Sequence, residues 1–253
     1  MIPPDDNLQF RLVEADQAIS DFVYCFSAFH NLAAIEEGII IPNGKIDLVL
    51  SFNDEGQFHI SLLGLETEPK MTPKQTFTKF FSISFEPLAV EYILRTEVAG
   101  LLNSGKKMPD NFWGFTAEDL FDFEAFCLKA SRVITSLIPN EVDQRKQLLF
   151  AELRMANGEV KVGEIAEKLG WNSRQINQYF NRFLGVSLKT YCRILRFQSS
   201  LRHIWEGELY PQLSYTDQSH FIKEVKKLSG VSPKELSRNE NSRFLQFLVY
   251  DKE

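Results

Sequence analysis

Long amide and guanidinium side chains are concentrated in residues 172–184 of this 253-residue chain. They are Arg174, Gln175, Asn177, Gln178, Asn181 and Arg182. Side chains of these types carry paired hydrogen-bonding groups that match the edges of base pairs in the major groove of DNA. The stretch therefore favours contact with a DNA duplex. The ordinary alternative is the solvated face of a helical hairpin, because polar outer faces are common on helices.

The residues around this stretch predict two short helices that cross at a tight turn. We expect helices over Val162–Leu169 and Asn172–Leu184, the second capped by its first residue. Gly170 between them suits a turn with positive φ, because glycine has no Cβ to clash. The small Ala166 allows a close crossing and Ile176 packs back into it, which is a helix-turn-helix arrangement. The polar side chains would lie on the outer face of the second helix.

A second helix with an exposed polar face is expected farther along the chain. Ser187 suits the N-cap of a long helix to about Glu206, roughly 30 Å long at 1.5 Å per residue. Thr216 would cap a further helix that buries apolar side chains on one side. Its exposed side would carry Gln218, Ser219, Lys223, Lys226 and Lys227. One turn of duplex measures about 34 Å, so the long helix could hold both polar helices in successive major grooves.

Three segments of this region resemble the C-terminal domain of the AraC/XylS family of bacterial transcription regulators. They are IAEKLGWNSRQINQYFNRFLGVS, the linker RILRF and YTDQSHFIKEVKKLSGVSP, and the similarity extends from about Val160 to Leu236. The resemblance implies two helix-turn-helix units that bind double-stranded DNA in a sequence-specific manner. RNA polymerase is expected as a further partner, and the protein is expected to be cytoplasmic.

By position in these motifs, the resemblance implies roles for individual polar side chains. The bases of the first groove would be read by Arg174, Asn177 and Gln178. Those of the second groove would be read by Gln218, Ser219 and Lys223. Arg182 would bind a phosphate, a contact that positions the protein without specifying a sequence. His220 is expected to have a structural or phosphate-facing role.

The second unit departs from the family pattern. Before Tyr215 the chain reads WEGELYPQLSY, which is shorter than the family usually shows. Pro211 falls where the supporting helix of this unit would run, so we expect that helix to be stunted or absent. A regulator that acts through protein contacts, with a degenerate second unit, is therefore the main alternative. The apolar segment RFLQFLVY, residues 243–250, is expected to pack on the body of the protein or on a partner.

The charge of the chain is unevenly distributed. Residues 1–150 hold 12 basic and 22 acidic side chains, whereas residues 151–253 hold 16 and 12, within a net charge of −6. Only the second part has the positive balance that suits a polyanion such as DNA. We expect a regulatory or association domain over residues 1–139 and a DNA-binding domain over residues 140–253.

The first domain is predicted to contain a β-sheet with helices, and the second to be all-α, so the fold class is α+β. Apolar residues alternate on both sides of NDEG, which predicts a β-hairpin over residues 46–62, and residues 77–85 suggest a further strand. Helices are expected over Ala89–Leu102, Thr116–Leu137 and Glu141–Ala156. IIPNGKIDLVLSF and FSISFEPLAVEYIL resemble an uncharacterised regulatory domain found ahead of some AraC-type domains. We expect this domain to bind a small-molecule effector of unknown class or to form a homodimer.

Residues suited to catalysis or metal binding are scarce. Cys25, Cys127 and Cys192 are far apart, which fits reduced thiols in a cytosol. Only His30 and His59 precede residue 200, too few for a typical metal-dependent β-barrel enzyme, and there is no Gly-rich phosphate loop. We expect no metal, no cofactor and no enzymatic activity, with a DNA-targeted enzyme as the remaining alternative. No stretch approaches the roughly 20 apolar residues that span a bilayer, so no membrane contact is expected.

Overall fold

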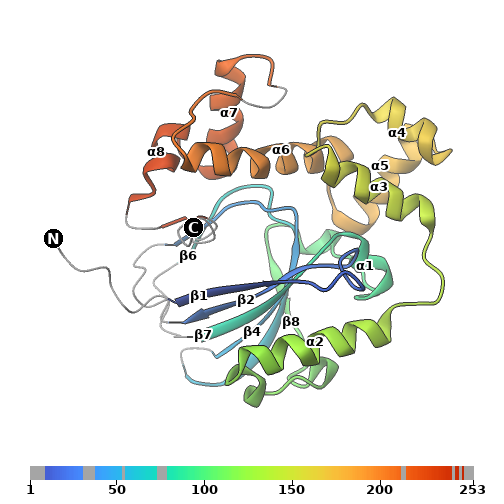
Figure 1. The fold of residues 1–253 in the computed structure, drawn as a ribbon, viewed down its shortest axis with the longest axis vertical. Coiled ribbons are helices and arrows are strands. Elements are labelled where there is room, and N and C mark those ends of the chain that lie inside the picture. Colours follow the sequence, from blue (N-terminus) through green and yellow to red (C-terminus); the bar gives the residue numbers. More distant parts are fainter. Residues whose placement is uncertain are drawn as a thin grey trace.

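The computed structural model describes residues 9–30, 38–52, 55–72, 79–211, 215–240, 243–244 and 247 (Figure 1). The predicted first domain, residues 1–139, is called the N-terminal module here, and its described part contains a six-stranded antiparallel sheet. In spatial order its strands are β1 (Gln9–Glu14), β2 (Val23–His30), β7 (Lys79–Phe85), β4 (Ile46–Phe52), β5 (Phe58–Leu63) and β8 (Gly105–Lys107). A separate pair consists of β3 (Gly38–Ile40) and β6 (Lys70–Thr72). The predicted hairpin is confirmed as β4 and β5 and the further strand as β7, whereas Phe77 lies outside the described residues.

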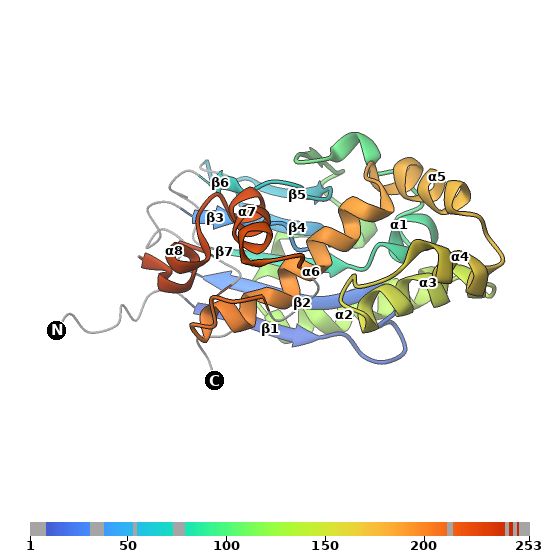
Figure 2. The same ribbon diagram turned by 90° about the horizontal axis from the view of Figure 1, so that it is seen from above.

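The two faces of the sheet differ in chemistry because side chains alternate along each strand. One face is apolar, and in β7 it is formed by the fully buried Phe81, Ile83 and Phe85. The helix α2 (Phe123–Leu137) covers this face, with 5.3 Å between the ring centroids of Phe126 and Phe81 (Figure 1). The opposite face lies under α6 (Leu188–Trp205), and it carries Ser27, Asp47, Ser82 and Ser84 (Figure 2).

Two helices of the N-terminal module differ from the prediction. In place of one helix over Ala89–Leu102, the chain forms α1 (Leu88–Tyr92) and a 3-10 turn, η2 (Ala99–Leu101). Arg95 between them has a φ of 49°, which a continuous α-helix cannot contain.

The predicted helix over Thr116–Leu137 is likewise divided, although it ends at the expected residue. Thr116 caps a 3-10 helix, η4 (Ala117–Leu120), and Asp122 then caps α2 with a side chain that accepts from the Ala125 amide at 3.0 Å. Leu128, expected on the apolar side, is 60% exposed. A further 3-10 turn, η3 (Phe112–Gly114), precedes this region.

The described part of the C-terminal region consists mainly of helices. They are α3 (Gln144–Met155), α4 (Val162–Leu169), α5 (Ser173–Leu184), α6, α7 (Gln218–Ser229) and α8 (Pro233–Arg238). α3 ends before Asn157 and Gly158, which both have positive φ, as the predicted stop requires. The α+β fold class is therefore confirmed. No helix of the described residues has both the length and the apolar character needed to cross a membrane.

Two clusters of buried apolar side chains hold the molecule together. The larger one joins the sheet and α2 to α3, α4 and α5, and it includes Phe85, Leu149 and Phe180. The smaller one lies around α6, α7 and α8, and it takes side chains from the N-terminal module as well. The two parts of the chain are thus packed against each other, with α6 lying across the sheet (Figure 2).

Candidate nucleic-acid interface and ligand cavity

The first helix-turn-helix unit, α4 and α5, has the geometry predicted for it. Gly170 ends α4 with a φ of 60°, and Asn172 caps α5. The Asn172 side chain accepts from the Gln175 amide at 2.9 Å, and the Gln175 side chain accepts from the Asn172 amide at 2.8 Å. Ala166 and Ile176 are buried at the crossing, with exposures of 7% and 0%. A reciprocal cap of this kind satisfies two amides that the start of a helix leaves unpaired.

The three side chains of α5 that were predicted to read bases differ in exposure and in hydrogen bonding. Arg174 and Gln178 are exposed and make no hydrogen bond or ion pair within the described part of the chain. Asn177 is half-buried; its Nδ2 donates to the Ser173 carbonyl at 3.0 Å and its Oδ1 accepts from the Leu188 amide at 3.2 Å. The Asn177 amide therefore joins α5 to the first turn of α6.

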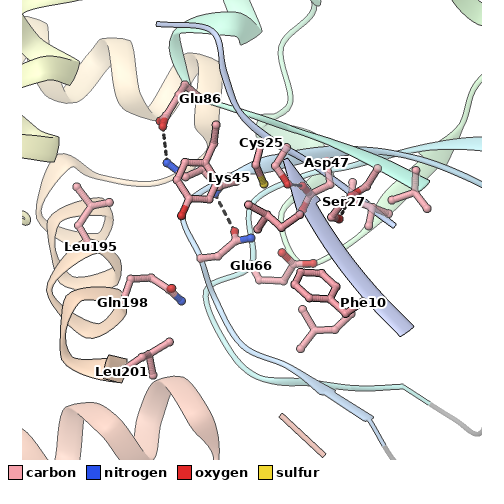
Figure 3. A pocket seen from close by; sticks show the side chains of 18 of the residues that line it. Phe10, Cys25, Ser27, Lys45, Asp47, Glu66, Glu86, Leu195, Gln198 and Leu201 are labelled. Atoms are coloured by element: carbon pink, nitrogen blue, oxygen red, sulfur yellow. Dashed lines mark hydrogen bonds and ion pairs between the residues drawn. The ribbon is translucent and has the colours of Figure 1, made fainter. Parts of the chain in front are cut away.

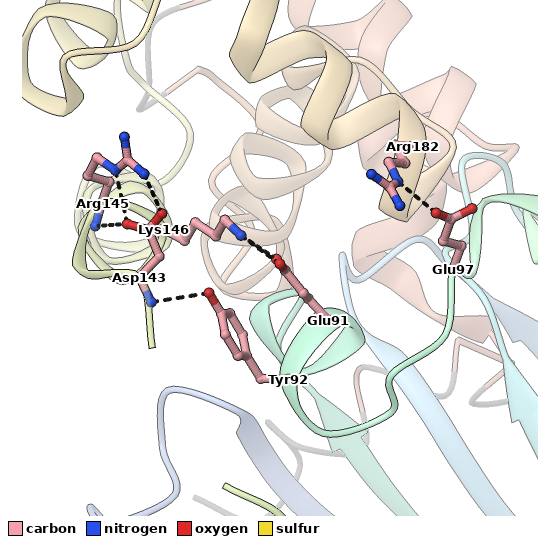
Figure 4. A network of polar contacts seen from close by, with 7 residues as sticks. All are labelled: Glu91, Tyr92, Glu97, Asp143, Arg145, Lys146 and Arg182. Atoms are coloured by element: carbon pink, nitrogen blue, oxygen red, sulfur yellow. Dashed lines mark hydrogen bonds and ion pairs between the residues drawn. The ribbon is translucent and has the colours of Figure 1, made fainter. Parts of the chain in front are cut away.

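The C-terminal end of α5 contacts the N-terminal module. Arg182 Nε lies 2.7 Å from Glu97 Oε1, and both side chains remain more than half exposed (Figure 4). Beside this pair, the Val98 amide donates to the Phe183 carbonyl at 3.0 Å. At Gly185 a Cβ atom would lie 2.8 Å from a backbone oxygen of the module, and the φ of this residue is 75°, so glycine is required there.

α3 forms a further part of this interface. Lys146 Nζ lies 2.6 Å from Glu91 Oε1, and both side chains are mostly buried (Figure 4). The Asp143 amide donates to the Tyr92 hydroxyl at 3.1 Å. These contacts join α1 to α3, the helix that precedes the first unit.

The second unit contains α7, and the N-cap residue of this helix differs from the predicted one. Asp217, not Thr216, is the N-cap, and its side chain accepts from the His220 amide at 2.7 Å. His220 has a structural contact, since its Nδ1 accepts from the Thr216 amide at 3.3 Å. The predicted exposed residues are all exposed in the structure: Gln218, Ser219, Lys223, Lys226 and Lys227.

The supporting helix of the second unit is missing from the described residues of segment 206–217, which leave out 212–214. The apolar side of α7 packs in a cluster with α6 and α8 that also takes in residues from both ends of the chain. Ile39 and Ile41 of the N-terminal module and Phe244 and Phe247 of the C-terminal tail belong to its buried cluster. The Ile39 amide donates to the Arg243 carbonyl at 2.7 Å.

The same packing confirms, for the described residues, that the apolar tail packs on the body of the protein. Phe244 and Phe247 are fully buried on the body of the protein, whereas the remainder of segment 243–250, apart from Arg243, lies outside the described residues. The part played by Ile39 and Ile41 was not predicted. An apolar run at residues 39–41 was the available signal, but its partner lies about 200 residues away in the sequence, beyond the reach of periodicity arguments.

A cavity of about 510 Å³ lies between the polar face of the sheet and α6 (Figure 3). On its floor, the hydroxyls of Ser27 and Ser82 are hydrogen-bonded at 2.6 Å, and the Ser84 hydroxyl donates to Asp47. On the opposite wall, α6 contributes Gln198, whose amide donates to the Pro42 carbonyl.

Burial changes the acidity of the groups that line this cavity. It raises the pKa of the Cys25 thiol to about 12. It raises the pKa of Glu66 to about 7, and the nearby charge of Asp47 adds to that effect. The pKa of Asp47 is itself raised by burial. Sequence reasoning missed this site because alternating serine and aspartate residues on strands are equally typical of a solvent-facing side.

Solved structures of ToxT from Vibrio cholerae are similar to this chain at low sequence identity. One in a P21 crystal form is 13% identical, covers 92% of this chain and 98% of that chain, and has a TM-score of 0.44. A ToxT structure from strain O395 has 12% identity with the same coverage and TM-score. A third, bound to an unsaturated fatty acid, is 12% identical over 93% of this chain and 96% of that chain, with a TM-score of 0.35. No curated protein sequence matches the chain.

The model of a family described as "Helix-turn-helix domain" matches residues 165–239. The match begins inside α4, includes α5, α6 and α7, and ends just after α8. It therefore covers α5 and α7, the two helices predicted to read bases. Residues 165–239 of this chain therefore form a helix-turn-helix domain.

Proposed function

We propose that this chain is a DNA-binding transcription regulator of the AraC type that reads two successive major grooves of one duplex, the first through α5 and the second through α7. The main support is that each helix exposes unpaired polar side chains while α6 joins the two units without a break. The 18 residues of α6 measure about 27 Å at 1.5 Å per residue, against about 34 Å for a duplex turn. The side chains that would read bases are Arg174, Gln178, Gln218, Ser219 and Lys223.

Asn177 and Arg182 have other parts in this proposal. Asn177 would keep α5 and α6 in register, because both ends of its amide are already bonded to the backbone. Arg182 would bind a phosphate, as expected from its place in the motif. Since it is paired with Glu97, the phosphate would replace that carboxylate when DNA binds.

Selection from a library of random duplexes, followed by gel shifts at graded salt, tests this proposal. Arg174→Ala should relax the preference at one base position, with a loss of about 1–3 kcal/mol there. Arg182→Ala should weaken binding to all sequences alike and reduce the slope of log affinity against log salt by about one. Arg132→Ala, on an exposed part of α2, is the matched control for loss of charge.

Two outcomes would contradict the proposal. Equal losses on every sequence for Arg174→Ala and Arg182→Ala would remove the distinction between base reading and phosphate binding. Selected sites with sequence preference in one groove only would exclude base reading by α7. That result would favour the alternative in which the second unit acts through protein contacts.

We also propose that residues 1–139 are a regulatory domain that responds to a small molecule in the cavity. The volume of about 510 Å³ is within the roughly 300–1,000 Å³ of most ligand sites. An occupant would touch both the sheet and α6, the helix that joins the two reading units. Contact with RNA polymerase, homodimer formation and a cytoplasmic location stay predictions.

A further inference from the structure

The charged side chains of the cavity are unequally partnered. Three carboxylates, those of Asp47, Glu66 and Glu86, line it together with two cations, Lys45 and Arg154. Both cations lie near the same carboxylate, and Arg154 is in addition paired with Asp21, at 3.3 Å from its Oδ1. Lys45 Nζ lies 2.6 Å and Arg154 Nη1 lies 3.8 Å from Glu86 Oε1. Lys45 is therefore already paired with Glu86, at one end of the cavity (Figure 3).

Glu66 and Asp47 are left without an ion pair in the described part of the chain. Glu66 is only 5% exposed, and no side chain of the described residues donates a hydrogen bond to its carboxylate. Asp47 accepts from the neutral hydroxyl of Ser84. The raised pKa of each group has burial as its main cause, and the charge of Asp47 further raises that of Glu66. Two neighbouring carboxylates of this kind are stabilised by an added positive charge.

Besides the serines of the floor and Gln198, the lining has an apolar and partly aromatic part. Phe10, Phe29 and Phe80 form a row, with 4.6 Å between the ring centroids of each adjacent pair. Leu195 and Leu201 of α6 belong to the opposite wall. A ligand that matches both the apolar lining and the two carboxylates therefore has an apolar or aromatic body and one positively charged end.

We propose that the cavity binds an organic amine with an apolar body, whose ammonium group is held by Glu66 and Asp47. This assignment rests on the proposed function of the cavity as an effector site. An anionic ligand of the same shape is disfavoured, because Lys45 and Arg154 already neutralise Glu86 and the two remaining carboxylates repel it. The bound amine would bridge the sheet and α6, and so reach the helix between the two DNA-reading units.

Three probes of nearly equal shape separate the ligand classes: phenylbutylamine, phenylbutanol and phenylbutanoate. Binding to the full chain would be measured by calorimetry and by thermal unfolding at about pH 8, where an alkylamine is protonated. The amine should bind most tightly, the alcohol more weakly and the carboxylate least. Glu66→Gln and Asp47→Asn should each lower amine affinity about ten-fold or more, the loss expected for a charged hydrogen bond, and leave the alcohol unchanged.

The unliganded variants provide a check on folding. Glu66→Gln should keep or raise the melting temperature, because it removes a buried carboxylate that has no ion-pair partner among the described residues. A purely structural Glu66 would instead give a lower melting temperature. Glu118→Gln, at an exposed position, is the matched control and should change neither the melting temperature nor amine binding.

The outcomes distinguish this inference from the proposed function. Preferential binding of phenylbutanoate or phenylbutanol, or amine binding that persists in both variants, would overturn the amine assignment and leave the cavity as an effector site. Failure of all three probes to bind would overturn the effector site together with its ligand class. DNA reading would be unaffected in each case, because duplex selection tests it separately.

Discussion

α5 has a supporting helix in its own unit, whereas α7 has none among the described residues and packs in a cluster that adds segments from both ends of the chain to α6 and α8. The first unit has a supporting helix, a glycine turn at Gly170 and a reciprocal cap at Asn172. The second lacks a described supporting helix and uses Ile41 and Phe244 in its place. The polar faces of the two helices are nevertheless similar in exposure. The orientation of a reading helix can therefore be supplied within its unit or by distant segments.

This difference has a consequence for regulation. Ile39 and Ile41 lie beside Ile40 and Asn43, which line the cavity, so the segment that supports α7 also borders the proposed effector site. α5 has a separate link to the N-terminal module through Glu97 and Arg182. A change in the module would thus reach both helices through buried apolar packing, and α5 also through the exposed pair of Glu97 and Arg182.

The largest expected effect comes from Ile41→Ala, which removes apolar volume beneath α7. Ile41 is fully buried, so the free energy of unfolding should fall by about 2–5 kcal/mol. Native-state amide hydrogen exchange should become faster in α7 than in α5. Met71→Ala, in the neighbouring β6 and 65% exposed, is the control. Equal loss of protection in both helices would show that the two units are not held separately.

An intermediate effect is expected from the helix caps. Asp217→Ala and Asn172→Ala should each lower the free energy of unfolding by about 1 kcal/mol, the usual value of an N-cap. Footprinting on selected DNA should show greater loss of protection in the second groove for Asp217→Ala than in the first groove for Asn172→Ala. The reason is that Gly170 and α4 also hold the start of α5.

Asp217→Ser and Asn172→Ser keep a capping oxygen and serve as controls for these variants. They should restore most of the lost stability. If Asn172→Ala instead reduced protection as much as Asp217→Ala, the supporting helix would contribute little to the placement of α5.

The smallest effect is expected from Glu97→Gln, which releases Arg182 for a phosphate. Because the pair is exposed, the free energy of unfolding should change by no more than about 1 kcal/mol. DNA affinity should rise by a few-fold on all sequences. Glu167→Gln removes one exposed negative charge from α4 and controls for net charge. An equal rise in both variants would mean that Glu97 acts only through its charge, without competing for Arg182.

Sequence reasoning was most successful where the signals were local. The Gly170 turn and the Asn172 and Ser187 caps all lie within a few residues of the helices that they delimit, and all three are confirmed. It failed where a helix was interrupted to suit a distant contact. The predicted helix over Ala89–Leu102 breaks so that residues 97–99 can meet α5, and no pattern within that segment indicated it.

In the candidate DNA interface, too, local features were predicted correctly and a contact with a separate helix was not. Arg174 and Gln178 were chosen as outward-facing residues on a helix of known period, and both are exposed. Asn177 was chosen by the same argument, yet the Leu188 amide engages its side chain. The helical period predicts on which face of a helix a side chain lies. It does not predict which backbone group of another segment packs against that face.

Residue order alone was enough to locate both polar helices and their outer faces, because caps, turns and apolar spacing act over a few residues. The support of α7 by Ile41 and the meeting of Asp47 with Glu66 in one cavity emerged only with the folded chain. Burial and charge at these places depend on segments that are brought together by packing, and the energies of those contacts exist only once the segments meet.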